Sequence, residues 1–236
     1  MDFRTRLLMT LCAVAPVLRV PGVMVAGSEV PNLLEPGARA TLVVSRDVDV
    51  AVAVESHAGV KARLRELRGL RRSEEEPSVW LPQDADLIEV NFIGMDTRGG
   101  HAGETYVFED SELPMLVFAN LSLLRPGKPL AIEGLEVPVP RPAGLLLEKL
   151  LTDRSGEKGD RDLLVALALL LVCGPPDLDE LELQYRGLSA EFRFAARSGL
   201  GALSLLEPRL QLPDPTPHRS LLARLLARLE STEQER

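Results

Sequence analysis

The sequence predicts an α/β (α+β) protein in which a small mixed β-sheet with flanking helices precedes a C-terminal helical bundle. Short apolar runs rich in β-branched residues alternate with helical segments up to about residue 140. Beyond that point, helical patterns follow one another without a strand signal. The 236 residues, 45% of them apolar, are enough for a substantial core. We therefore expect two regions, residues 1–140 and residues 141–236.

The N-terminal region begins with an expected helix that ends near Pro16 and a turn at the Arg-Val-Pro-Gly sequence. Ser56 is suited to cap a charged helix, and the run Arg71–Pro77 has the polarity of a solvated loop. The expected helices are 3–18, 29–34 and 57–68. The expected strands are 23–26, 42–54, 79–81, 87–93, 117–120, 130–132 and 135–139, with Gly134 at the last turn.

The C-terminal region consists of expected helices. Pro142 is suited to the first turn of a helix, and the segment from Gly159 to Cys173 is apolar on nearly every side, which predicts burial. The expected helices are 142–152, 159–173, 177–186, 188–197 and 217–234.

Composition indicates a soluble, cytoplasmic protein. The net charge of −8 gives none of the basic excess that duplex nucleic-acid binding normally leaves, although a local basic groove is compatible with it. The longest later apolar stretch is about half of what a membrane span needs, so no membrane partner is expected. Cys12 and Cys173 are far apart in the sequence, and we expect both to be reduced and buried. Arg4, Arg6 and the apolar run after them also fit a secretory signal, but Asp2 interrupts its basic flank.

Asp47 and Asp49 are the strongest candidate site residues. Residues two apart in a strand point to the same side, so the two carboxylates should project together from an otherwise apolar strand. Keeping both charged near a core is costly unless a cation compensates them. Mg²⁺ or Mn²⁺ is suited to this role, because such ions take one or two carboxylates and leave other positions to phosphate oxygens. The alternative is two solvated aspartates at an exposed strand edge.

A further candidate lies in the strand 87–93. The same alternation places Glu89 and Asn91 on one face. Two-metal phosphoryl transfer needs a third carboxylate, and Glu89 could supply it, with Asn91 as a substitute ligand. The alternative for Glu89 is an outward-facing edge residue.

Gly27 and Ser28 stand between an expected strand and an expected short helix. Backbone N–H groups and a hydroxyl at such a position are suited to phosphate oxygens. A Gly-Ser pair alone says little, but its place between these elements makes Gly27 and Ser28 candidates to bind phosphate oxygens.

The order of these segments resembles the DNA polymerase β-type nucleotidyltransferase superfamily. The resemblance rests on Val25-Ala-Gly-Ser28, Ser45-Arg-Asp-Val-Asp-Val50 and Ile88-Glu-Val-Asn-Phe-Ile93, followed by a helix with Lys149 and by Arg161-Asp162-Leu163. It covers roughly residues 20 to 172 and is closest to bacterial nucleotidyltransferase-fold proteins and the AbiEii-type toxins of toxin–antitoxin systems. Two departures stand out, because Ala26 replaces the more usual first glycine and Asn91 stands where the family has its later acidic residue.

The resemblance implies nucleotide-binding roles in the C-terminal region. In the related families the residue corresponding to Lys149 faces the triphosphate, and a compact ammonium suits that partner. Lys158 and Asp162 open the expected buried helix and are further nucleotide-binding candidates. The alternatives are that Lys149 snorkels to solvent and that Asp162 complements the helix dipole.

Two functional hypotheses follow. The first is a metal-dependent enzyme that transfers a nucleoside monophosphate from an NTP to a hydroxyl of RNA, protein or a small molecule, with catalytic Asp47, Asp49 and Glu89 and a cognate partner protein of the toxin–antitoxin kind. The second is a catalytically degenerate nucleotidyltransferase fold that acts as a binding or regulatory module, and Asn91 favours it.

Overall fold

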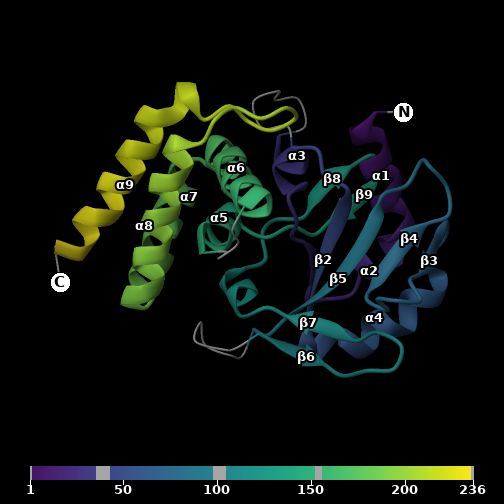
Figure 1. Cartoon of the computed structure of the whole chain (residues 1–236). Coiled ribbons are helices and arrows are strands. Elements are labelled where there is room, and N and C mark those ends of the chain that lie inside the picture. The colour runs from purple at the N-terminus through teal and green to yellow at the C-terminus, as the bar shows by residue number, and fades with distance from the viewer. Residues whose placement is uncertain (1, 36–42, 98–104, 152–155, 235–236) are drawn as a thin grey trace. The chain divides into compact units, whose positions relative to one another are not determined.

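The computed structural model describes residues 2–35, 43–97, 105–151 and 156–234, with side chains up to residue 231 (Figure 1). The chain forms two compact units. Unit 1 contains residues 1–30, 45–122 and 126–140, and unit 2 contains residues 31–44, 123–125 and 141–236. Unit 2 thus includes residues 31–44 and 123–125, which the sequence division placed in the N-terminal region. Each unit is described by itself.

Unit 1 contains a mixed sheet of seven strands within the described residues. Their order is β1-β2-β5-β4-β3, with β7 joined to β5 and β6 to β7. The strands are β1 (Val23–Val25), β2 (Asp47–Ala53), β3 (Leu70–Arg72), β4 (Val79–Pro82), β5 (Glu89–Met95), β6 (Tyr106–Phe108) and β7 (Met115–Val117). Only the β2–β5 and β5–β7 pairs are parallel. The mixed α/β class that the sequence predicted is therefore confirmed.

The central strands β2 and β5 alternate between buried and half-buried residues over their first halves. Val48, Val50, Val90 and Phe92 are all at most 1% exposed. β-Branched and aromatic side chains at every second position are what a strand with one buried face requires.

Helices α1 (Phe3–Ala13), α2 (Ala15–Leu18) and α4 (His57–Arg63) belong to the same unit. The Asp2 side chain caps α1 by accepting a hydrogen bond from the Thr5 N–H at 2.8 Å. The Thr10 hydroxyl accepts one from the Ile88 N–H at 2.9 Å and so ties α1 to the residue before β5. A separate hairpin joins β8 (Leu130–Ile132) to β9 (Leu135–Val137) through Gly134, whose φ of 83° suits glycine.

Unit 2 contains all but the first residue of α3 (Val30–Leu34). Its other helices are α5 (Pro142–Leu151), α6 (Gly156–Val172), α7 (Pro175–Gly187), α8 (Ala190–Leu205) and α9 (Arg219–Gln234). Helix α5 contacts α6, α7 and α8, which explains why every residue from Ala143 to Leu151 is buried. Helix α9 packs on α8 and α7.

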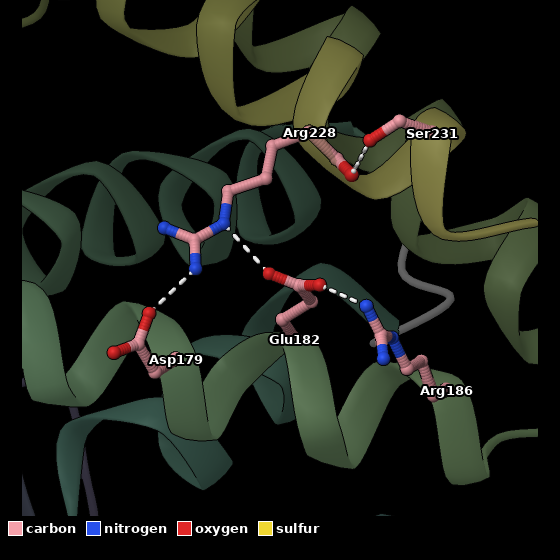
Figure 2. Close-up of polar contacts among 5 residues, drawn as sticks. All are labelled: Asp179, Glu182, Arg186, Arg228 and Ser231. Carbon is pink, nitrogen blue, oxygen red and sulfur yellow. Dashed lines mark hydrogen bonds and ion pairs between the residues drawn. The ribbon is translucent and has the colours of Figure 1, made fainter. Parts of the chain in front are cut away.

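Ion pairs connect α9 to α7 (Figure 2). Arg228 Nε lies 2.8 Å from Glu182 Oε2, and Arg228 Nη2 lies 2.6 Å from Asp179 Oδ1. Glu182 also pairs with Arg186 one turn along α7. One arginine thus bridges two successive turns of the neighbouring helix.

Several element boundaries differ from the sequence prediction. The expected strand 42–54 begins only at Asp47, because Asn32 holds Val43 through both its N–H and C=O, and Val44 N–H donates to Gln211 C=O. The expected first helix is divided in two. α1 ends at Ala13, and α2 begins at Ala15 with Pro16 in its first turn. Residue 42 of that strand and residue 152 of the helix after Pro142 lie outside the described residues.

Short strands account for most other differences. β3 lies at the start of the expected loop 71–77, β6 was not predicted, and the expected strand 117–120 is instead β7 followed by a 3₁₀ turn at Ala119–Leu123. Cys12 is exposed and Cys173 half-buried, and both are unpaired. The reduced state expected for the two thiols stays a prediction, and neither thiol is fully buried as expected.

In the part of the chain that the structure describes, none of the helices is long and apolar enough to cross a membrane.

Candidate functional site

The candidate site lies where the parallel strands β2 and β5 begin. Asp47 stands opposite Glu89 in the register, and Asp49 stands opposite Asn91. All four residues are half-buried, and they alternate with fully buried apolar neighbours. The alternation predicted from the sequence therefore places these four side chains on one face of the sheet.

Asn91 connects the two aspartates. Its Nδ2 lies 3.0 Å from Asp47 Oδ2 and 3.4 Å from Asp49 Oδ1, so one amide group donates to both carboxylates. The Asn91 Oδ1 atom is buried and has no hydrogen-bond partner among the described residues. A neutral amide thus occupies the position between the two acids, with an unused acceptor beside them.

A chain of hydroxyl groups reaches Asp47 from the turn after β1. Ser28 Oγ donates to Ser45 Oγ at 3.1 Å, and Ser45 Oγ donates to Asp47 Oδ1 at 2.7 Å. Both Asp47 oxygens therefore accept a hydrogen bond, which fixes the orientation of its carboxylate. Ser45 was not predicted as a site residue, although its position two residues before Asp47 on an alternating segment was a usable signal.

Glu29 is the second residue that sequence reasoning missed. Its side chain is completely buried, and its Oε1 accepts a hydrogen bond from the Asp49 N–H at 3.1 Å. Burial, the Asp49 carboxylate and, to a smaller extent, Asp47 raise the pKa of Glu29 well above its ordinary value. The sequence did not indicate that Glu29 is buried against Asp49, because a single glutamate after a Gly-Ser pair is normally solvated.

Gly27 packs directly against this carboxyl group. A Cβ atom at Gly27 would lie 2.7 Å from Glu29 Oε1 and closer still to Oε2. The space beside Gly27 is thus filled by the Glu29 carboxyl group, which a larger residue at position 27 would displace. The turn leads into α3, which has only five residues.

Glu89 differs from the other site residues because no hydrogen bond constrains its carboxylate in the described residues. Burial raises its pKa, and the negative charges of Asp47 and Glu76 add to this. A carboxylate with a raised pKa is better suited to accept a proton from a substrate. Glu89 was predicted for this face, and the register places it beside Asp47.

The predicted residues Lys149, Lys158 and Asp162 belong to unit 2. Lys149 Nζ lies 3.1 Å from Glu148 Oε2 and 3.8 Å from Asp162 Oδ1. Lys149 and Asp162 are 9% and 8% exposed, whereas Lys158 is exposed at the start of α6. Within unit 2, Lys149 does not snorkel to solvent but is compensated by two buried carboxylates.

Among the residues that the structure describes, no three histidine, cysteine, aspartate or glutamate side chains are grouped as metal ligands. The protein ligands at this site would therefore be two carboxylates with an amide oxygen. Mg²⁺ accepts such a limited set when water and phosphate oxygens complete its coordination.

Comparison with solved structures gives a likeness of fold at low sequence identity. No protein-family model matches the chain, and no curated protein sequence matches it. Among solved structures, the chain is similar to an antigenic nucleotidyltransferase-like protein from Paracoccidioides brasiliensis, with 15% identity and a TM-score of 0.43. The match covers 92% of this chain and 94% of that one.

Proposed function

We propose that this protein is a metal-dependent nucleotidyltransferase that transfers a nucleoside monophosphate from an NTP to a hydroxyl group. The observation that carries the proposal is the juxtaposition of Asp47, Asp49, Glu89 and Asn91 at the start of two parallel strands. The Ser28–Ser45–Asp47 hydrogen bonds add a link from the turn after β1 to the same carboxylates. The order of these segments is the one in which the chain resembles the nucleotidyltransferase superfamily.

The residues at this face fit a divalent cation such as Mg²⁺ or Mn²⁺. Asn91 Oδ1 is a buried acceptor with no partner among the described residues, and rotating the amide by half a turn would direct it toward the carboxylates. That orientation would place three oxygens together, which is favourable only when a cation lies between them. Asp47, Asp49 and Asn91 would hold the ion, with Glu89 next to them.

When bound, the ion neutralises phosphate charge during transfer. The acceptor oxygen would form a bond to the α-phosphorus, the bond to pyrophosphate would break, and the hydroxyl proton would pass to the Glu89 carboxylate. The hydrogen bond from Ser45 Oγ to Asp47 Oδ1 does not depend on the orientation of the Asn91 amide, and it reduces the rearrangement of the Asp47 carboxylate needed at that step. Gly27 and Ser28 would lie near the phosphates, and the resemblance adds Lys149, Lys158 and Asp162 as nucleotide-binding residues.

The test combines a binding measurement with a transfer measurement. The wild-type protein should gain thermal stability when Mg²⁺ and one of the four NTPs are present together, and it should transfer label from α-³²P-labelled NTP. Asp47→Asn and Asp49→Asn should abolish both effects. Glu89→Gln should abolish transfer while stabilisation by Mg²⁺ and NTP persists. Absence of stabilisation by all four NTPs in the wild type would contradict the proposal.

A second candidate function is that of a binding or regulatory module without catalysis. The Asn91 amide supports it, because its two hydrogen bonds compensate Asp47 and Asp49 without a cation. Stabilisation by Mg²⁺ and an NTP without any label transfer in wild-type protein would favour this second function.

The acceptor class and the biological context belong to the same proposal. RNA, a protein side chain and a small molecule are each compatible with hydroxyl transfer. The likeness to toxin–antitoxin proteins adds a cognate partner protein in a bacterial cytoplasm. Labelled-NTP incubation with total RNA, and separately with total protein, would identify the acceptor class.

A further inference from the structure

The side chain of Glu29 lies at the end of the hydrogen-bond ladder between β1 and β2. These strands are antiparallel, with Met24 opposite Ala51 and Val25 opposite Val50. The Ala26 N–H continues the ladder by donating to the Asp49 C=O at 2.9 Å. In a regular antiparallel pair the Asp49 N–H would return a hydrogen bond to the Ala26 C=O.

The Asp49 N–H instead donates to Glu29 Oε1 at 3.1 Å. A side-chain oxygen thus replaces the backbone carbonyl that the next rung of the ladder would use. Because Glu29 supplies this acceptor, the chain after β1 can turn away from β2 at Gly27 while the Asp49 N–H stays hydrogen-bonded.

Two further observations connect Glu29 to its surroundings, one through packing and one through hydrogen bonds. The Glu29 side chain is fully buried, and its carboxyl group fills the space beside the Gly27 backbone. The turn that it supports carries Ser28, whose hydroxyl reaches Asp47 through Ser45. Glu29 is therefore connected to Asp49 directly and is linked to Asp47 through the same turn.

We propose that Glu29 is a positioning residue, which completes the β1–β2 ladder at Asp49 and thereby orients the two aspartates of the candidate site. The effect on metal binding rests on the proposed function, whereas the effect on the Asp49 amide does not. Groups that orient metal ligands through hydrogen bonds typically contribute 10- to 100-fold to metal affinity, so removal of Glu29 is expected to cost about that much.

The test uses three full-length variants. Glu29→Gln retains an acceptor oxygen of the same shape, whereas Glu29→Met retains the length but has no acceptor. Val60→Ala is the control, because Val60 is a fully buried residue of unit 1 on α4 and lies outside the site. The measurements are hydrogen exchange of the Asp49 amide by NMR and Mn²⁺ affinity from the electron paramagnetic resonance of free Mn²⁺.

We expect Glu29→Met to speed Asp49 exchange about tenfold, because the variant removes the acceptor that protects this amide. The Mn²⁺ affinity of this variant should fall about 10- to 100-fold. Glu29→Gln should restore both quantities to near wild-type values. Val60→Ala should change neither of them beyond its general loss of stability.

Unchanged Asp49 exchange in Glu29→Met would overturn the proposal. Faster exchange together with wild-type Mn²⁺ affinity would also overturn it, since Glu29 would then stabilise the ladder without orienting the carboxylates. If wild-type protein binds no Mn²⁺, the proposed function fails instead, and Asp49 exchange alone decides whether Glu29 completes the ladder.

Discussion

At the scale of single residues, the site depends on how Asn91 compensates two carboxylates. Replacing Asn91 by Asp removes both donated hydrogen bonds and adds a third negative charge beside Asp47 and Asp49. We expect Asn91→Asp to destabilise the metal-free protein by on the order of 2 kcal/mol, because hydrogen bonds to charged groups are strong and like charges repel. Mg²⁺ should recover this loss, since three carboxylates bind the ion more strongly than two.

Urea unfolding with EDTA and with Mg²⁺ checks this prediction. Asn91→Ser serves as a matched control, because it also removes the amide but adds no charge. If Asn91→Asp is as stable as the wild type in EDTA, the amide does not compensate the aspartates.

The two cysteines differ in environment, and we expect them to differ in reactivity. Burial, reinforced by the charge of Asp177, raises the pKa of the Cys173 thiol to about 12. Cys12 is exposed on α1. Because the thiolate is the reactive form, Cys173 should react with iodoacetamide at pH 8 roughly 100-fold more slowly than Cys12.

Mass spectrometry of Cys12→Ser and Cys173→Ser proteins measures the two rates separately. Equal rates in the folded variants would show that Cys173 is not shielded.

At the scale of elements, helix α9 is attached to α7 by Arg228. This guanidinium donates to Glu182 and thereby lowers the pKa of Glu182 below its ordinary value of 4.5. The unfolded chain therefore binds more protons than the folded one as the pH falls below about 4.5, and the stabilisation is lost as the pH falls through the lowered pKa. At neutral pH the contribution is fully present.

Arg228→Met should increase amide exchange along α9 and cost about 0.5–1 kcal/mol, since the arginine side chain is 37% exposed and its ion pairs are screened. Arg224→Met is a suitable control, because Arg224 is exposed on the same helix one turn earlier. The difference between the variants should shrink at pH 3. A pH-independent difference would show that Arg228 acts by packing.

Helices α5 and α6 share the buried charges of Glu148, Lys149 and Asp162. Removing the cation in Lys149→Met leaves two carboxylates in a buried environment, which should cost about 3–5 kcal/mol of unfolding free energy. Lys158→Met, at an exposed position on α6, should have little effect. If Lys149→Met weakens nucleotide binding but leaves urea unfolding unchanged, Lys149 serves the ligand and not the helix pair.

Elements were predictable from sequence where a local pattern determines them. The alternation of Asp47-Val-Asp-Val50 and of Glu89-Val-Asn-Phe92 correctly indicated one polar and one apolar face. β3 and β6 were not predicted, because two of the three residues of β3 are arginines of the charged run and β6 is largely exposed, so each strand depends on pairing with a neighbour. The strand expected from residue 42 was too long because Asn32, distant in sequence, binds the backbone of Val43.

At the scale of the whole molecule, the fold class and the polar face of β2 and β5 could be predicted, whereas the contacts that organise the face could not. Glu29 meets Asp49 across 20 positions of sequence, and Asn91 meets Asp47 across 44. Such pairings are set by strand register and by the turn at Gly27, neither of which is encoded in a short motif.

The proposed function requires Asp47, Asp49 and Asn91 to bind a divalent cation together with a nucleotide. The most direct measurement is NMR of the Asn91 side-chain amide while Mn²⁺ is titrated in the presence of an NTP. The paramagnetic ion should broaden the Asn91 Nδ2 proton signals and the Asp49 amide signal first, and Asp47→Asn should prevent this. Sharp Asn91 signals at Mn²⁺ concentrations that broaden other parts of the spectrum would contradict the claim.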